Sequence, residues 1–542
     1  MPKPRSLLRV TGGHVIDPVH DVDTLADVWI EGGRVVEPPA ATESTQTTTI
    51  DARGCIVMAG AIDTHSHIAG SKVNAARLLQ PELARNSTVP KQRRSRSGVR
   101  SVVPTTHVTG YTYAGLGYTM AVDAAIPPLA ARHVHLEFAD TPIIDKAMLV
   151  LLGNNHFVMD CLREKEPARL LDYVSWILRA THAFGVKVVD PGGVEQWKQA
   201  RGRLTSLDDE VAGFGVRPRD ILLGLAQAID TLALPHPMHL HGMNLGMPGC
   251  AQDTLALLRA LDGHRLHLAH VQFLSYGGTP SDPRSLTSAT AALADYVNMH
   301  ANVSCDIGQV VFGETTTMTA DAPVGEFLHR LHGRKWVSHD VEQETGCGVV
   351  PITYSDKNFV HALQWCIGLE WFLLVQDPWK LALSTDHPNG GTFWSYPRII
   401  AWLMNRDLRD QVIARLPKQV LKRTQLADLS RQYTLSEIAI ITRAAPARIL
   451  GMRDRGHLGP GARADLVVYD RNADVETMFS FPRLVLKNGQ IVLREGQIEA
   501  IPDGETERAS PEYDPKVIPS IKAWFDREAS IAFENFALGE QP

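Results

Sequence analysis

Short, continuous apolar runs recur along the middle of this chain, and each ends in polar or charged residues. Eight of them lie between residues 57 and 391: VMAGAIDTHSH, YTMAVDAAIPP, KAMLVLLGNNH, GVKVVDPGG, PMHLHGMN, RLHLAHVQF, YVNMHANVSCD and LALSTDHPNGG. Strands of a parallel sheet are buried on both faces and therefore look continuous rather than alternating. Longer segments that could hold helices separate the runs. The sequence therefore predicts an α/β fold, a (β/α)8 TIM barrel over residues 56–446 with insertions.

The two ends of the chain have a different pattern. Short β-like segments with Gly-Gly and Asp-Pro turns fill residues 1–55, and a similar set, with an Asn-Gly hairpin signal, fills residues 447–500. We expect both ends to form one small β-sandwich domain. Residues 501–542 form a C-terminal extension with one helix, whose apolar face could pack on the barrel or on a partner.

Composition narrows the class of protein. The 542 residues carry a net charge of -6 with 21% charged residues, a mild acidic balance that argues against nucleic acid or an anionic membrane as the main partner. No apolar stretch approaches the roughly 18 residues that span a bilayer. The six cysteines are scattered, without a C-x-x-C pair, which argues against an iron–sulfur or structural zinc module and favours a reducing, cytoplasmic location.

Histidines stand at the ends of several apolar runs. His65 and His67 end the first run, and a side-chain period of two points both imidazoles to the same side of a strand. With 22 histidines in the chain, H-x-H pairs also arise by chance. The evidence for a metal ligand is therefore the position of a histidine at the end of an apolar run. His241 ends the fifth run and His270 closes the sixth; we predict both as metal ligands, with His239 as a supporting residue or substrate contact. Three other histidines are expected to be structural: His133, His135 and His267.

A lysine and an aspartate complete the predicted set. Lys187 lies inside the fourth apolar run, where burial favours a neutral amine that can react with CO2 to form a carbamate. The bare strand pattern favours a buried ion pair, but the position among the histidine ligands favours carbamylation. Asp386 ends the eighth run and could bind a metal and accept a proton from water, or merely cap the next helix. Asn244 after the fifth run could orient a substrate or form a turn.

Longer motifs carry a resemblance. AIDTHSH at the entry to the barrel, ITRAAPARILGM and GPGARADLVVYD resemble the cyclic amidohydrolase superfamily of dihydroorotases, hydantoinases and ureases. KVVDPGG, HLHGMNLG, TTHVTGYTYAGLGYTMAVDAAIPP, LLGNNH and STDHPNGG resemble, more narrowly, the A subunits of formylmethanofuran dehydrogenase and of the bacterial formyltransferase/hydrolase complex. The resemblance runs over nearly the whole chain.

The resemblance implies a specific chemistry. It implies two zinc ions bridged by N6-carboxylated Lys187, with His65 and His67 on one metal, His241 and His270 on the other, and Asp386 on the first metal and as the catalytic proton carrier. The reaction would interconvert an N-formyl furan coenzyme with formate and the free amine, beside formyltransferase or dehydrogenase-like subunits. A hydantoinase-like cyclic amidase and a non-catalytic scaffold remain the alternatives. The basic residues 83–100 could be a solvated loop, a subunit contact or a clamp for an acidic substrate tail.

Overall fold

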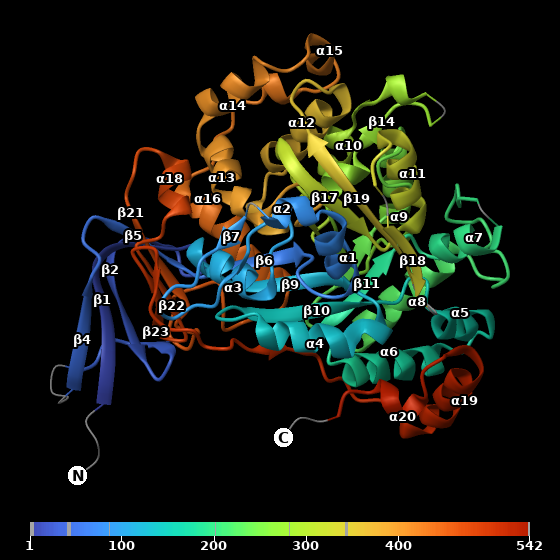
Figure 1. Cartoon of the computed structure of the whole chain (residues 1–542), viewed down its shortest axis with the longest axis horizontal. Helices are drawn as coiled ribbons and strands as arrows, with labels where there is room; N and C mark the ends of the chain where they lie inside the picture. The colour runs from blue at the N-terminus through green and yellow to red at the C-terminus, as the bar shows by residue number, and fades with distance from the viewer. Residues whose placement is uncertain are drawn as a thin grey trace.

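A parallel barrel forms the centre of the molecule (Figure 1). The computed structural model describes residues 5–40, 45–85, 87–200, 202–280, 282–335, 337–341 and 345–539. Within these ranges the barrel strands follow one another in chain order: β6 (Ala61–Ser66), β9 (Tyr118–Ile126), β10 (Asp145–Leu151), β11 (Gly185–Val189), β12 (Met238–His241), β13 (Leu266–Leu268), β16 (Val303–Asp306) and β20 (Leu381–Ala382). Each of the eight predicted runs supplies one strand, which confirms the predicted fold class.

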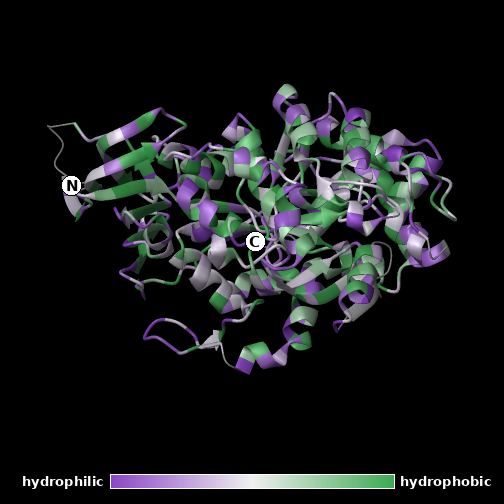
Figure 2. Ribbon diagram, turned by 90° about the horizontal axis from the view of Figure 1, so that it is seen from above, coloured by the Kyte–Doolittle hydropathy of each residue, from purple (hydrophilic) through white to green (hydrophobic). Residues whose placement is uncertain are grey.

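Contacts between the first strand and the segment after the last strand close the barrel. Ser66 and His387 form a parallel bridge, and the His67 amide donates to the His387 carbonyl at 2.8 Å. The strands are buried along almost their whole length, and Figure 2 shows apolar residues in the centre of the molecule as well as in the terminal sheet and the helices. This burial explains why their sequences look continuous instead of alternating.

Strands from both chain ends form a separate, mainly antiparallel sheet. It contains β1 (Arg5–Asp17), β2 (Val22–Glu31), β3 (Arg34–Val36), β4 (Thr45–Asp51), β5 (Cys55–Ala59), β21 (Leu466–Asp470), β22 (Leu484–Lys487), β23 (Gln490–Arg494) and β24 (Gln497–Ile498). The sheet curls, so that the Val35 amide donates to the Ala462 carbonyl at 2.8 Å. Asn488 and Gly489, both with positive φ, form the predicted hairpin turn. The domain boundaries at residues 55 and 447 stay a prediction; by strand pairing, β5 joins this sheet.

An insertion between the seventh and eighth barrel strands lies at the carboxyl ends of the strands. It consists of β17 (Gly313–Thr319), α11 (Ala322–His332), β18 (Val337–Val341) and β19 (Thr345–Tyr354), and β17, β19 and β18 pair as a small antiparallel sheet. β17 and β19 also pack on α1 (Ser71–Leu79), which follows the first barrel strand. The insertion therefore forms part of the surroundings of the barrel mouth.

The C-terminal extension packs on barrel helices. Figure 1 shows α19 (Ile518–Glu528) and α20 (Phe533–Phe536) beside α5 (His156–Arg163) and α6 (Pro167–Thr181). Trp176 of α6 stacks with Phe533 and Phe536 at ring distances of 5.7 and 5.6 Å. Of the two expected positions for this apolar face, the barrel is the one observed. Within the described ranges, no helix is both long and apolar enough to cross a membrane.

A buried ion cluster joins the barrel, the terminal sheet and the extension. Asp145, at the start of β10, accepts a hydrogen bond from Lys487 of β22 at 2.7 Å and also pairs with Arg455. Lys487 donates in addition to Asp465 at 2.8 Å, and the Glu505 amide donates to Asp145 at 2.7 Å. The cluster lies at the amino-terminal ends of the strands, the end of a barrel that is associated with stability rather than chemistry.

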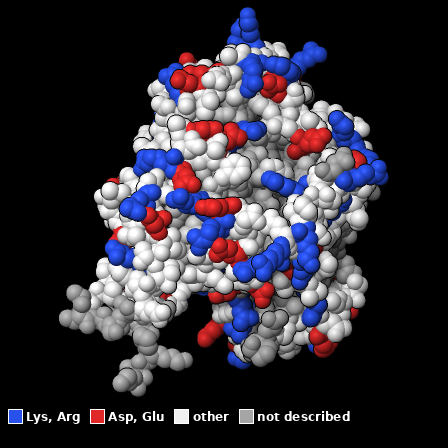
Figure 3. All heavy atoms as spheres, turned by 60° about the vertical axis from the view of Figure 1, so that its left-hand side comes forward, with Lys and Arg blue, Asp and Glu red and all other residues white. Residues whose placement is uncertain are grey.

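The basic segment 83–100 lies on the surface and contacts the rest of the chain. The Arg96 guanidinium donates to Asp140 at 2.9 Å, and the Arg100 guanidinium lies 5.7 Å from the centre of the Trp394 ring. On the face shown in Figure 3, basic and acidic side chains are interspersed.

Candidate metal centre

The six predicted ligands line one cavity of about 250 Å³ at the carboxyl ends of the barrel strands. They come from five different strands or strand ends, and each is at most 5% exposed: His65, His67, Lys187, His241, His270 and Asp386. The carboxyl ends of parallel strands meet at one edge of a barrel, which explains how residues more than 300 positions apart in sequence reach a common site.

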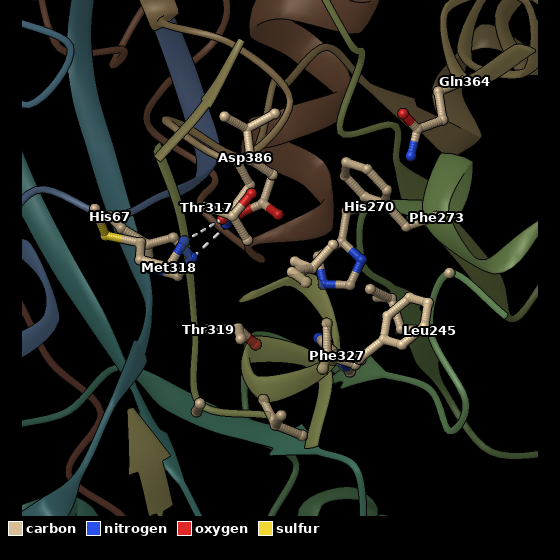
Figure 4. A pocket seen from close by; sticks show the side chains of 18 of the residues that line it. His67, Leu245, His270, Phe273, Thr317, Met318, Thr319, Phe327, Gln364 and Asp386 are labelled. Carbon is tan, nitrogen blue, oxygen red and sulfur yellow. Dashed lines mark hydrogen bonds and ion pairs between the residues drawn. The ribbon is translucent and has the colours of Figure 1, made fainter. Parts of the chain in front are cut away.

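Asp386 lies between the two histidines of the first strand. Its Oδ1 is 3.2 Å from Nε2 of His65 and 3.1 Å from Nε2 of His67, and Figure 4 shows His67 and Asp386 pointing toward each other. Asp386 has a φ of 52°, an uncommon conformation for a residue other than glycine. Burial opposes the charge on this carboxyl group, but the neighbouring histidines hold its pKa well below the ordinary value.

Lys187 is buried and has no hydrogen-bond partner for its amine among the described residues. In the sheet it pairs with Leu151 on one side and His239 on the other, so its side chain belongs to the interior of the barrel. Burial lowers the pKa of the amine to about 7, against the opposing charges of Asp306 and Asp386. A large fraction of the amine is therefore neutral near pH 7, the form that can react with CO2.

His241 and His270 form the other side of the site. Their ring centres are 4.6 Å apart, and those of His65 and His270 are 5.2 Å apart. Burial lowers the pKa of His241 and takes that of His270 well below its ordinary value, so both imidazoles are neutral. A neutral imidazole has the lone pair that a metal needs. Nδ1 of His270 has no hydrogen-bond partner in the described part of the chain.

Two residues predicted as substrate contacts lie outside this cavity. His239 is fully buried below the ligands, where its Nε2 is 3.1 Å from Nδ1 of His65 and its Nδ1 is 3.0 Å from Nε2 of His236. Asn244 donates to Asp253 at 3.0 Å and lines a separate, smaller cavity of about 130 Å³. The residues that follow it, Leu245 and Gly246, do line the main cavity.

The three histidines expected to be structural also lie outside the cavity. His133 and His135 belong to α4 (Ala131–Asp140), on the outside of the barrel. His267 is buried in β13, with its Nε2 3.1 Å from Oδ2 of Asp306.

Three buried aspartates beside the ligands were not singled out from the sequence. Asp306 ends the seventh apolar run and Asp123 lies in the second, so both stood within the predicted strands. The position of Asp306 at the end of its strand was the signal that could have identified it, whereas Asp123 lies inside its strand. Asp321 precedes α11 in the insertion, and no strand pattern marks it.

Apolar side chains, many from the insertion, form much of the cavity wall around the ligands. Figure 4 shows Met318, Phe327, Phe273 and Leu245 around the open space, with His67, Asp386 and His270 facing it. A few convergent polar groups in a mostly apolar cavity are typical of a small-molecule site.

The donor set fits divalent metal ions. His65, His270 and Asp386 present one ligand atom each within 4.8 Å of one another. Imidazoles and a carboxylate are common zinc ligands. The Lys187 amine and Nδ1 of His270, which have no hydrogen-bond partner among the described residues, are groups that such a site would satisfy. The geometry and the chemistry of the ligands therefore agree.

This fold and this site define a class: a TIM-barrel, metal-dependent hydrolase acting on carbon–nitrogen bonds. The comparison with protein families makes the class specific. The family model "Amidohydrolase family" matches residues 48–493, and the chain belongs to this family. The family implies a binuclear metal site, and the His and Asp groups described above could hold the ions.

Two relatives match almost from end to end. Protein FwdA of Methanocaldococcus jannaschii is 40% identical over 98% of this chain and 96% of its own length. The A subunit of the formyltransferase/hydrolase complex Fhc of Methylorubrum extorquens is also 40% identical, with the same two coverages. The resemblance to these A subunits is thus confirmed.

Solved structures agree with these relatives. A chain in the crystal structure of the formyltransferase/hydrolase complex (FhcABCD) from Methylorubrum extorquens, in complex with methylofuran, matches with a TM-score of 0.93 and 39% identity, over 98% of this chain and 96% of the matched one. A D-hydantoinase from Bacillus sp. AR9 matches with a TM-score of 0.51 at 15% identity, over 94% of this chain and 99% of that one, and shows the shared fold alone.

Proposed function

We propose that this chain is a binuclear-metal formamide hydrolase that works as one subunit of a larger one-carbon complex. Its substrate would be an N-formyl derivative of a methanofuran- or methylofuran-type amine. Water and the formamide would give formate and the free amine, and the reverse reaction would restore the formamide. The proposed partners are formyltransferase or dehydrogenase-like subunits.

One observation carries this proposal: similarity at 39% identity to a chain of a complex crystallised with methylofuran, over almost the full length of both chains. A family membership alone would leave the substrate open, because amidohydrolases act on many carbon–nitrogen bonds. End-to-end similarity at this level supports the same substrate class.

We assign the metals and ligands within the site as follows. Two zinc ions would be held by His65 and His67 on one side and by His241 and His270 on the other. N6-carboxylated Lys187 would bridge them, and Asp386 would complete the first. When bound, the metal pair would supply Lewis acidity and lower the pKa of water toward neutrality. The amine of Lys187 is buried and has no hydrogen-bond partner among the described residues. This supports carboxylation, because the carbamate would replace an unsatisfied amine with an anionic ligand for the metals.

Asp386 would carry the proton. Its carboxylate lies beside the histidine ligands, where it would accept a proton from the attacking water. It would then return that proton to the nitrogen of the amine as the carbon–nitrogen bond breaks. The apolar wall of the cavity would hold the furan ring and limit access of bulk water. For His239 the structure supports the supporting role, whereas a direct substrate contact by Asn244 would require a substrate that reaches beyond the main cavity.

Metal analysis combined with formate release tests the proposal. The purified chain, alone and with its co-expressed partner subunits, would be analysed for zinc and incubated with N-formylfurfurylamine. We expect about two zinc ions per chain and formate release that the Asp386→Asn variant loses. Ring opening of hydantoin without formate release would instead indicate a cyclic amidase. A chain without metal or activity in either preparation would indicate a scaffold.

A further inference from the structure

Three of the predicted histidine ligands have a buried carboxylate beside one ring nitrogen. Nδ1 of His65 lies 2.9 Å from Oδ2 of Asp306. Nε2 of His241 lies 3.2 Å from Oδ2 of Asp321. The third pair is more distant, with Nδ1 of His67 3.6 Å from Oδ1 of Asp123. The three aspartates come from β16, from the insertion and from β9.

Backbone amides hold the other oxygen of each of these carboxylates. Oδ1 of Asp306 accepts from the His270 amide at 2.8 Å, and Oδ1 of Asp321 accepts from the Val324 amide at 3.0 Å. A backbone N–H can only donate, so this oxygen must remain an acceptor. The orientation of each carboxyl group is therefore fixed, and its second oxygen is directed at the imidazole.

The same pattern occurs in the third pair. Oδ2 of Asp123 accepts from the amides of Ile68 and Ala69 at 2.8 and 2.9 Å, and Oδ1 is left facing His67. Because the distance to the imidazole is longer, we expect the smallest effect at this position.

We propose that Asp306 and Asp321 are positioning residues that fix the tautomers of His65 and His241. A carboxylate oxygen accepts, so the facing ring nitrogen carries the proton and the opposite nitrogen keeps its lone pair. Nε2 of His65 and Nδ1 of His241 would then be the metal-binding atoms. The inference rests on the metal ligands assigned under the proposed function. Carboxylate–histidine–metal arrangements of this kind raise the metal affinity of a site.

Asp321 also links the insertion to the metal site. It caps the amino end of α11 in the insertion, and the same insertion supplies much of the cavity wall. The segment that encloses the cavity is thereby joined to His241 by a hydrogen bond. Packing of the insertion over the cavity would therefore also fix the orientation of His241.

An Asp-to-Asn substitution tests the inference without changing shape. In Asp306→Asn and Asp321→Asn the backbone amide retains the carbonyl oxygen, so the new NH2 group must face the imidazole. At Asp321 two donors would oppose each other unless the imidazole of His241 changes tautomer, and the new tautomer has its proton on the metal-binding nitrogen. We therefore expect metal affinity to fall about tenfold or more in Asp321→Asn. At Asp306 the NH2 group would also face Nε2 of His267, and Nδ1 of His65 can donate to Nε2 of His239 instead, so we expect a smaller fall in Asp306→Asn.

Glu370→Gln is the matched control. Glu370 of α12 (Phe359–Leu374) is fully buried, and one oxygen accepts from the Gln425 amide at 2.7 Å. Its other oxygen faces the Ser288 hydroxyl, which can turn and accept from an amide. This variant loses the same buried charge but should keep the metal affinity of the wild type.

Titration of the metal-free chains with Co²⁺, followed by visible absorption, gives the affinity without substrate. Thermal melts of the same samples show whether each chain is folded. Weaker binding in the two Asn variants, but not in Glu370→Gln, supports the inference. Wild-type affinity in a folded Asp321→Asn or Asp306→Asn chain overturns it. Asp321 lies outside the barrel strands, so its variant keeps the test decisive if Asp306→Asn does not fold.

The outcome is separable from that of the proposed function. A wild-type chain that binds Co²⁺ as expected but releases no formate would remove the proposed substrate and leave the positioning residues supported. A wild-type chain that binds no metal would overturn the positioning role together with the metal site.

Discussion

Two lysines of this protein are equally buried and have opposite surroundings. Lys187 at the mouth of the barrel and Lys487 at its opposite end are each 1% exposed. Lys487 donates to Asp145 at 2.7 Å and to Asp465 at 2.8 Å. The amine of Lys187 has no hydrogen-bond partner among the described residues, and burial lowers its pKa to about 7.

The comparison distinguishes a buried lysine that stabilises the fold through its ion pairs from a buried lysine that is available for chemistry. A buried ammonium group is costly unless it is paired, so a structural lysine is found with its carboxylates. A buried lysine without a carboxylate partner is instead expected where a bound group, such as a metal site, satisfies it. The two ends of the barrel thus differ as TIM barrels generally do, with chemistry at the carboxyl ends of the strands and stability at the amino ends.

Replacing Asp386 with Asn should have the largest effect on catalysis. We expect the rate of formate release to fall by about 10³-fold, because an amide cannot carry the proton, while zinc content and melting temperature stay near those of the wild type. Initial rates, elemental analysis and a thermal melt measure the three quantities. The matching change at the other end, Asp145→Asn, should lower stability and retain the rate per folded, metal-loaded chain. A fast Asp386→Asn enzyme would contradict the proposed proton carrier.

Replacing Lys487 with Met should have the largest effect on stability. The change leaves Asp145 and Asp465 buried with one cation fewer, and removal of one partner from a buried ion pair costs about 3–5 kcal/mol. The presence of Arg455 beside Asp145 places the expected value at the lower end of that range. Chemical denaturation of metal-free protein gives the free energy of unfolding. An unchanged value would show that the cluster adds no net stability to the fold.

Replacing Lys187 with Met should raise the stability of the metal-free chain, the opposite of the effect expected at Lys487. Metal binding and activity should be lost, yet the metal-free chain should gain roughly 1–3 kcal/mol, because an unpaired buried amine is removed. The gain depends on pH, since the pKa of the lysine is about 7 in the folded chain and 10.5 is its ordinary value. Between these two pH values the unfolded wild type binds more protons than the folded wild type, so the stability of the wild type rises with pH. The difference in stability between the wild type and Lys187→Met therefore narrows as the pH rises. A Met variant that is less stable at pH 7 would contradict this interpretation.

The acid response of the Asp145 cluster should give the smallest effect. Burial opposes the charge of Asp145, but Lys487 and Arg455 outweigh it and lower its pKa below the ordinary value of 3.8. Its stabilising contribution is therefore present above about pH 4 and is lost as the pH falls further. Melting temperatures between pH 5 and 3 should decline more steeply for the wild type than for Asp145→Asn. Parallel declines would show that other carboxylates dominate in this range.

Much of the fold could be predicted because its signals are local. A continuous apolar run followed by a polar residue is visible at each of the eight strands, and the carboxyl ends of parallel strands must meet. That reasoning brought Lys187, His241 and Asp386 together although no two of them are close in sequence. The insertion could not be predicted in the same way, because its strands lie outside the barrel and have no repeating pattern to identify them.

The sequence by itself determined the barrel, the sheet built from both ends and the polar residues at the strand ends, since each depends on the period and composition of a short segment. Only the tertiary structure decided what each polar residue faces. Asp306 reaches His65 across 241 positions and Asp321 reaches His241 across 80. It also decided that the amine of Lys187 has no hydrogen-bond partner among the described residues, whereas Lys487 is paired with two carboxylates. Hydrogen-bond partners of buried side chains depend on distances between distant segments, and these are fixed only when the barrel closes.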